Sequence, residues 1–202
     1  MAGNPTTHAP KPAPISTSET IRRRVAGSKQ RVCKVAARQF NSNSYDAASI
    51  ESIATEAGIA RSTFYRFFRD KEDVVRQMVN PVFEQTRERL EQIDPDQPEE
   101  IVNGIAACYL EVWRDQRDAL IFSASVGMSL FTLVQPAHDA CAQVVFDLMQ
   151  RVHDARLLRH DDPNLAAATV AQTVVRILQV CERHPQFENV FRSTLRGMLL
   201  KW

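Results

Sequence analysis

Side chains that donate and accept hydrogen bonds are concentrated around residue 65 of this 202-residue chain. Arginine, lysine, serine, threonine and tyrosine side chains bond to DNA phosphates, and several of them also bond to the edges of bases. The residues of this kind are Arg61, Ser62, Thr63, Tyr65, Arg66 and Lys71. Short helices in general have a solvated polar face, so the neighbouring elements decide whether this cluster is a binding surface.

Three helices are expected to position these side chains. Apolar residues recur at close to helical spacing over 19–40, with Lys and Arg on the other faces. Ser49 stands where an N-cap would, so a second helix is expected at about 49–57. Gly58 can adopt the positive φ of a sharp turn, after which a third helix is expected at about 60–68. A tight glycine-containing turn between two short helices is typical of a helix-turn-helix.

The third helix is expected to have separate inner and outer faces. Ile59, Phe64 and Phe68 should face the core, which leaves the polar cluster outside. Charge supports this interpretation, because residues 20–71 contain eleven Lys and Arg against four Asp and Glu, whereas the chain from residue 72 onward contains thirteen against nineteen. A basic head therefore precedes an acidic body, and a basic head favours a nucleic acid as partner.

The stretch SIESIATEAGIARSTFYRFFRDKEDVV resembles the DNA-binding signature of the TetR family of transcriptional regulators. The resemblance is strong over about residues 20–75. The positions that carry it are Ala57-Gly58, Thr63-Phe64-Tyr65, Phe68 and Lys71. The contacts that it implies are Arg61, Ser62 and Thr63 in the major groove, and Ser49, Tyr65 and Lys71 on the DNA backbone.

Two positions depart from the family pattern. Ala60 stands where the family often has a Ser or Thr cap, which weakens the start of the third helix by about 0.5–2 kcal/mol. Glu51 lies near the DNA-facing start of the second helix, where it would either repel phosphate or accept a hydrogen bond from a cytosine amino group. The sequence leaves both roles of Glu51 open.

The remainder of the chain is expected to form a larger helical domain, because none of its long apolar patterns has strand spacing. The expected fold is all-α: a disordered tail at 1–18, a helix-turn-helix DNA-binding domain at 19–70, and an effector-binding and dimerisation domain at 71–202. Pro81 is expected to kink the first body helix. Body helices are expected at about 71–91, 98–115, 136–156, 163–183 and 187–201, with a buried central helix or pair near 117–134.

The last two expected helices carry apolar residues on more than one face. A second apolar face needs a second partner, so a homodimer through a four-helix bundle is expected, and the family resemblance implies the same. A dimer would hold two reading helices about 34–36 Å apart, the spacing of successive major grooves. The expected partner is therefore a near-palindromic operator in double-stranded DNA.

Aromatic and sulfur-containing side chains on the central body helices are the candidates for a ligand pocket. Such side chains often line apolar pockets between bundle helices, and the family resemblance favours a small apolar or aromatic effector that relieves repression. Packing in the core is the alternative for each of them. The candidates are Tyr109, Trp113, Phe122, Met128, Phe131 and His138.

Other functions have less support in the sequence. It has no glycine-rich phosphate loop, no GxSxG and no HExxH, so neither an enzyme nor a cofactor is expected. His138 and Cys141 share a helix face beside Asp139, but core packing of the thiol is favoured over a metal site. The proline-rich first 18 residues have no apolar run, so we expect no membrane anchor and a cytoplasmic protein. The alternatives are a small-molecule or protein-binding sensor without sequence-specific DNA binding, and a non-specific DNA coat.

Overall fold

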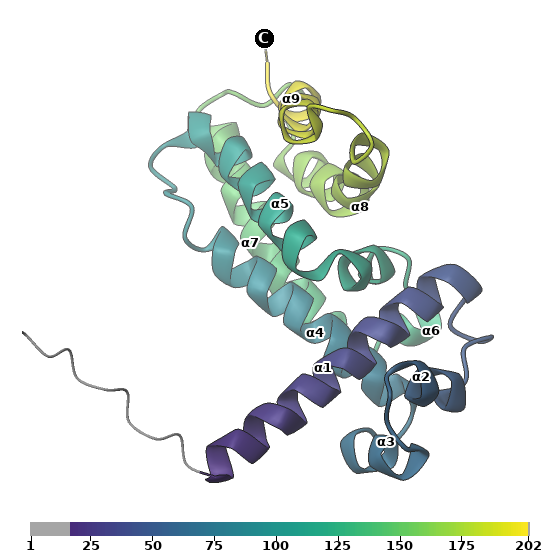
Figure 1. The fold of residues 1–202 in the computed structure, drawn as a ribbon. Coiled ribbons are helices and arrows are strands. Elements are labelled where there is room, and N and C mark those ends of the chain that lie inside the picture. The colour runs from purple at the N-terminus through teal and green to yellow at the C-terminus, as the bar shows by residue number, and fades with distance from the viewer. Residues whose placement is uncertain (1–16, 202) are drawn as a thin grey trace, which may run out of the picture.

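The computed structural model describes residues 17–201, most of which lie in α-helices (Figure 1). The predicted tail lies outside these residues except for its last two, which begin the first helix. Within 17–201, the strand-like pairing is limited to an isolated bridge between Leu158 and Leu200, so the all-α prediction is confirmed. The helices are α1 (Thr17–Asn43), α2 (Ile50–Glu56), α3 (Arg61–Phe67), α4 (Lys71–Leu90), α5 (Pro98–Ser123), α6 (Met128–Phe131), α7 (Gln135–Asp154), α8 (Pro163–Cys181) and α9 (Phe187–Leu199).

The first three helices and the start of α4 form the head of the molecule. Figure 1 shows α2 and α3 at the end farthest from the C-terminus, with α1 running across them and past the body. Phe64 and Phe68 are 0% and 1% exposed in the core that these helices share, while Ile59 is half-buried. The three predicted head helices and the inner face of α3 are therefore confirmed.

The remaining helices form the body. Helices α4, α5 and α7 pack side by side, and α8 and α9 cover one side of them (Figure 1). Their apolar faces bury a second core, which is separate from that of the head. Its largest fully buried members are Leu90, Ile101, Ile105, Leu110, Met149, Leu158, Leu178, Phe191 and Leu195.

Helices α4 and α5 join the two parts. The first half of α4 contributes Val74 and Val75 to the head core, and its second half contributes Val82 to the body core. Helix α5 is broken at Gln116, where φ is −140° and ψ is 37°. Beyond this break α5 packs on α1, and the ring centroid of Phe122 lies 5.2 Å from that of Phe40. Helices α4 and α5 therefore contribute side chains to both cores.

Two expectations about the middle of the chain differ from the structure. Helix α4 continues through Pro81 from Lys71 to Leu90, and the break in helical geometry lies in α5 instead. The predicted buried central helix is wrong beyond Ser123, because the four-residue α6 buries none of its residues. Serine explains the early end of α5: the Ser123 and Ser125 hydroxyls donate to carbonyls of the preceding turn, and such bonds compete with a continuing helix.

Helix α8 has an unusual amount of exposed apolar surface. It is the one described helix whose length and mean hydropathy of 1.2 would suffice to cross a membrane, a test that core helices also pass. Its outward side carries Leu165 and Val180, which are 50% and 81% exposed. Only one face of α8 is therefore covered within the described part of the chain.

Candidate nucleic-acid interface

The turn between α2 and α3 has the local geometry that its residues predict. Ser49 has extended backbone geometry, and its hydroxyl oxygen accepts a hydrogen bond from the Ser52 N–H at 3.0 Å. This bond caps α2 and leaves the Ser49 hydroxyl hydrogen free to donate, on a side chain that is exposed. Gly58 has a φ of +67°, which an L side chain adopts only with strain. The predicted cap and turn are therefore confirmed.

Helix α2 is fixed to α1 by polar contacts around Glu56. Arg38 donates to one Glu56 carboxylate oxygen at 2.9 Å, and Gln39 donates to the other at 2.6 Å. The Ser52 hydroxyl in turn donates to the Gln39 side-chain oxygen at 2.9 Å. Since Gln39 is only 8% exposed, this network holds α2 in one orientation on α1.

Helix α3 presents the polar cluster on its outer side. Its N-cap, Ala60, makes no side-chain capping bond, so the burial of Phe64 at its centre supplies the anchor. Thr63 is half-buried, which leaves its hydroxyl near the edge of the outer face. The exposed side chains are Arg61, Ser62, Tyr65 and Arg66. Their outward position is that required of residues that contact bases and phosphates.

Arg61 and Tyr65 are paired on this outer face. The Arg61 guanidinium carbon lies 5.8 Å from the centroid of the Tyr65 ring. The pKa of Arg61 is raised above its ordinary value. The hydrogen bond with Tyr65 is the largest cause, followed by the negative charges of ionised Tyr65 and of Glu51. Glu51 therefore acts on Arg61 across the turn, a relation that the sequence did not reveal.

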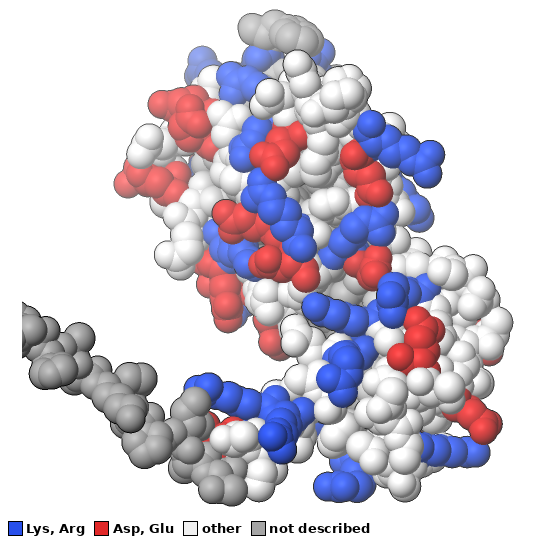
Figure 2. Space-filling model, viewed as in Figure 1, with Lys and Arg blue, Asp and Glu red and all other residues white. Residues whose placement is uncertain are grey.

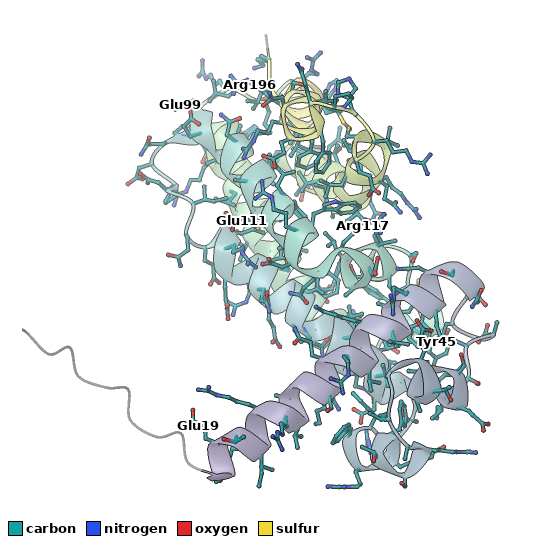
Figure 3. All side chains as sticks on the ribbon, in the orientation of Figure 1. Glu19, Tyr45, Glu99, Glu111, Arg117 and Arg196 are labelled. Atoms are coloured by element: carbon teal, nitrogen blue, oxygen red, sulfur yellow. The ribbon has the colours of Figure 1, made fainter. Side chains whose placement is uncertain are left out.

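Lys71 lies behind this surface and is bonded within the head. Its ammonium donates to the carbonyl oxygens of Tyr45 and Ala48, at 2.8 and 2.9 Å. It also lies 4.4 Å from the centroid of the Tyr45 ring, in the turn between α1 and α2 (Figure 3). This turn contains Ser44 at a φ of 75° and ends at Ser49. Lys71 thus fixes the segment that presents Ser49.

Positive charge is concentrated on the head. Figure 2 shows Lys and Arg side chains along α1 and at the α3 end of the molecule, whereas the visible face of the body mixes both signs. The exposed arginines of the first turns of α1 include Arg22 and Arg24. A surface of this kind attracts a polyanion over a range set by ionic strength.

Comparison with known proteins agrees with this geometry. Residues 32–78 match the family model described as bacterial regulatory proteins, tetR family. The head therefore matches the TetR family. The matched segment runs from the second half of α1 to the middle of α4, so it contains the whole of α2 and α3 and the whole polar cluster.

One curated relative and two solved structures give further context for this chain. It is 26% identical over 97 residues to the uncharacterized HTH-type transcriptional regulator YerO of Bacillus subtilis (strain 168), and the match covers 46% of this chain and 34% of YerO. The regulator PfmR from Thermus thermophilus has a TM-score of 0.66 at 17% identity, covering 84% of this chain and 97% of PfmR. AibR in complex with isovaleryl coenzyme A and operator DNA has a TM-score of 0.69 at 16% identity, and the match covers 86% of this chain and 98% of AibR. These likenesses extend the family's fold to the body.

The structure does not bring the six predicted ligand residues together. Tyr109 and Trp113 pack in the body core, and burial raises the pKa of Tyr109 well above its usual range. Phe122 belongs to the head core, and Met128 is 84% exposed. Phe131 and His138 are neighbours, with ring centroids 4.9 Å apart. None of the six lines the cavity around Ile93 and Gly104 or the cavity where α1 crosses α4 and α5, and core packing accounts for Tyr109, Trp113 and Phe122.

The thiol beside His138 is not prepared for metal binding. Burial raises the pKa of Cys141 to about 12, so that it is a neutral thiol at neutral pH. His138 is instead paired with Asp139, whose carboxylate oxygen lies 2.9 Å from the ring nitrogen. Among residues 17–201, no group of three or more His, Cys, Asp or Glu is placed to hold a metal ion.

Proposed function

We propose that the chain is a TetR-family regulator, a dimeric repressor that binds a near-palindromic operator and is released by a small effector. The observation that carries the DNA half is the division of α3 into a buried Phe64 and an exposed polar face. That AibR was solved with operator DNA and isovaleryl coenzyme A supports both halves of the proposal. In this proposal the chain has a DNA-binding head at 19–70 and a body at 71–202 that binds the effector and forms the dimer.

The proposed roles follow the positions of the side chains. Arg61, Ser62 and Thr63 read base edges, while Tyr65 and Arg66 hold the DNA backbone. Ser49 donates its free hydroxyl hydrogen to a phosphate. Lys71 acts through the turn that it holds, because its ammonium is already bonded to two carbonyl oxygens.

The dimer is proposed to form through α8 and α9. Val180 is 81% exposed, and Leu165 and Met198 are 50% and 36% exposed. Large exposed apolar side chains on adjacent helices indicate an interface. Light scattering at micromolar concentration tests this part, and a monomeric mass would contradict it.

Fluorescence anisotropy with genomic DNA fragments at near-physiological salt tests the DNA half. We expect tight binding to a small subset of fragments, lost in Arg61→Ala and Tyr65→Ala. Glu84→Ala, at an exposed position in the second half of α4 and remote from α3, is the matched control and should bind as the unmodified protein does. Weak and equal binding to all fragments would reject sequence-specific recognition and favour the sensor alternative.

A further inference from the structure

A groove of about 1130 Å³ lies where α1 crosses the body. Its walls come from α1 over residues 26–38, from α4 over 77–85, and from α5 over 114–119, on both sides of the break at Gln116. We call it the junction groove. Small-molecule sites typically have volumes of about 300–1,000 Å³ and are often found between domains, so the junction groove has room for a ligand.

The junction groove has an apolar part formed by all three helices. Ala37 and Met78 in its lining are 1% and 3% exposed, and Pro81 and Ala119 lie beside them. Cys33 adds to this part, because burial raises the pKa of its thiol to about 11 and keeps it neutral. An apolar ligand segment would therefore find partners here without meeting a charge.

The rest of the lining is basic. Figure 2 shows Lys and Arg side chains gathered where α1 meets the body. Three acidic residues, Glu56, Asp115 and Asp118, also line the groove. The six basic residues are Lys29, Arg31, Lys34, Arg38, Arg114 and Arg117. Their excess gives the groove a net positive charge.

The arginines of the groove already have partners. Arg38 pairs with Glu56 at 2.9 Å, Arg117 (labelled in Figure 3) pairs with Glu182 at 2.8 Å, and Arg114 pairs with Glu188. Arg31 donates to the Ala57 carbonyl at 3.4 Å. These contacts compensate most of the guanidinium charge.

The two lysines are different. Within residues 17–201, neither Lys29 nor Lys34 forms a salt bridge; the Lys29 ammonium lies 3.5 Å from the Gln77 side-chain oxygen and 5.9 Å from the centroid of the Phe68 ring. Five residues apart on one helix, the two lysines stand about 7.5 Å apart along its axis and about 140° apart around it. The junction groove therefore combines an apolar part with two ammonium groups that no carboxylate neutralises.

We infer that the junction groove binds an anionic amphiphile, with its acidic group at Lys29 and Lys34 and its apolar chain against Met78 and Pro81. A neutral apolar ligand would leave the ammonium groups without a counter-charge as it displaced their water. A small polar anion would leave the apolar part of the groove in contact with water. Only a ligand with both parts satisfies the whole lining.

This inference names the class of effector that the proposed function leaves open, and its regulatory part rests on that function. A ligand in the groove contacts α1 of the head and α4 and α5 of the body at once. It therefore changes the relative free energies of head orientations if it fits one of them better. Operator affinity then depends on the ligand.

Isothermal titration calorimetry of the full chain without DNA tests the site directly. The probes are decanoate and decyl phosphate, both kept below the concentrations at which they form micelles, and the neutral decanol. We expect at least one anionic probe to bind at least tenfold more tightly than decanol. We also expect Lys29→Gln/Lys34→Gln to weaken that binding at least tenfold.

Arg22→Gln/Arg24→Gln is the matched control, since it removes the same charge from exposed positions of the same helix outside the groove. It should leave probe binding within about twofold of the unmodified protein. Absence of binding by both anionic probes, equal binding of decanol, or equal losses in the two double variants would each overturn the site.

Operator anisotropy with and without the bound probe tests the regulatory part separately. We expect the probe to weaken operator binding at least fivefold in the unmodified protein and not in Lys29→Gln/Lys34→Gln. Unchanged operator affinity with a bound probe would reject the effector role while the calorimetry upholds the site. Failure of every DNA fragment to bind would reject the proposed function and leave the calorimetric result to decide the groove.

Discussion

Replacing Lys71 by methionine distinguishes a residue that positions the DNA-binding surface from one that contacts phosphate. Methionine keeps most of the apolar stem and removes the ammonium, which donates to the Tyr45 and Ala48 carbonyls at 2.8 and 2.9 Å. A hydrogen bond to a charged group contributes about 1.5–3 kcal/mol, and partial exposure of Lys71 favours the low end. For the two bonds we therefore expect a loss of about 3 kcal/mol in the free energy of unfolding.

The effect on DNA binding separates the two roles. A phosphate contact contributes about 0.9 to the slope of log K against log salt, so losing Lys71 from both protomers of a dimer would reduce the slope by about 1.8. A residue that acts through the turn before Ser49 contributes little to that slope. We therefore expect Lys71→Met to weaken operator binding by a similar factor at all salt concentrations.

Urea denaturation and anisotropy between low and physiological salt measure both quantities. Arg66→Met is the control, because this exposed side chain on α3 should reduce the slope without a comparable loss of stability. An unchanged free energy of unfolding together with a slope reduced by about 1.8 for Lys71→Met would refute the positioning role.

Three further predictions concern stability and assembly. Gly58→Ala should cost about 1–2 kcal/mol of unfolding free energy, because φ is +67° there; Gly127→Ala, also in open space but at a φ of −69°, should cost less, and equal urea midpoints would contradict this. Burial would raise the pKa of Asp73, but hydrogen bonds from the Arg69 N–H and Gln77 outweigh it and lower the pKa below 3.8. The stabilisation from Asp73 is then present above pH 3.8 and is lost as the pH falls through the lowered pKa; Asp73→Asn should therefore differ from the unmodified protein at pH 6 and converge with it in acid, and a constant difference would exclude this linkage. Val180→Asp should shift the mass in light scattering from dimer to monomer, whereas Gln92→Asp, exposed just after α4, should not; a dimer in both variants would place the interface elsewhere.

Local signals in the sequence were sufficient for the head. The Ser49 cap, the positive φ of Gly58 and the burial of Phe64 and Phe68 all depend on residues within one or two turns of one another. Capping bonds and turn geometry are short-range, so residue types at fixed spacing specify them. The bounds of α2 and α3 were accordingly predicted to within one residue.

Contacts between residues far apart in the chain were harder to predict from the sequence. The break of α5 at Gln116 lies between the helix predicted to about 115 and the segment predicted near 117–134, but the exposed α6 was missed, because an apolar run does not reveal which of its side chains find a partner. The same limit applies to the ligand candidates: Tyr109 and Phe122 have residue types suited to a pocket, but they fill two different cores.

The sequence by itself determined the all-α class, the helix-turn-helix and the outward face of α3, because helical periodicity and local capping are properties of neighbouring residues. Only the tertiary structure decided the partners of Lys71, which lie 23 and 26 residues away, and the meeting of α1 with α4 and α5 around Lys29 and Lys34. Such contacts depend on how whole helices pack, and many packings are compatible with the same apolar pattern. The physical difference is one of range: hydrogen bonds within a turn are set by the chain itself, whereas a groove between helices exists only after both cores have formed.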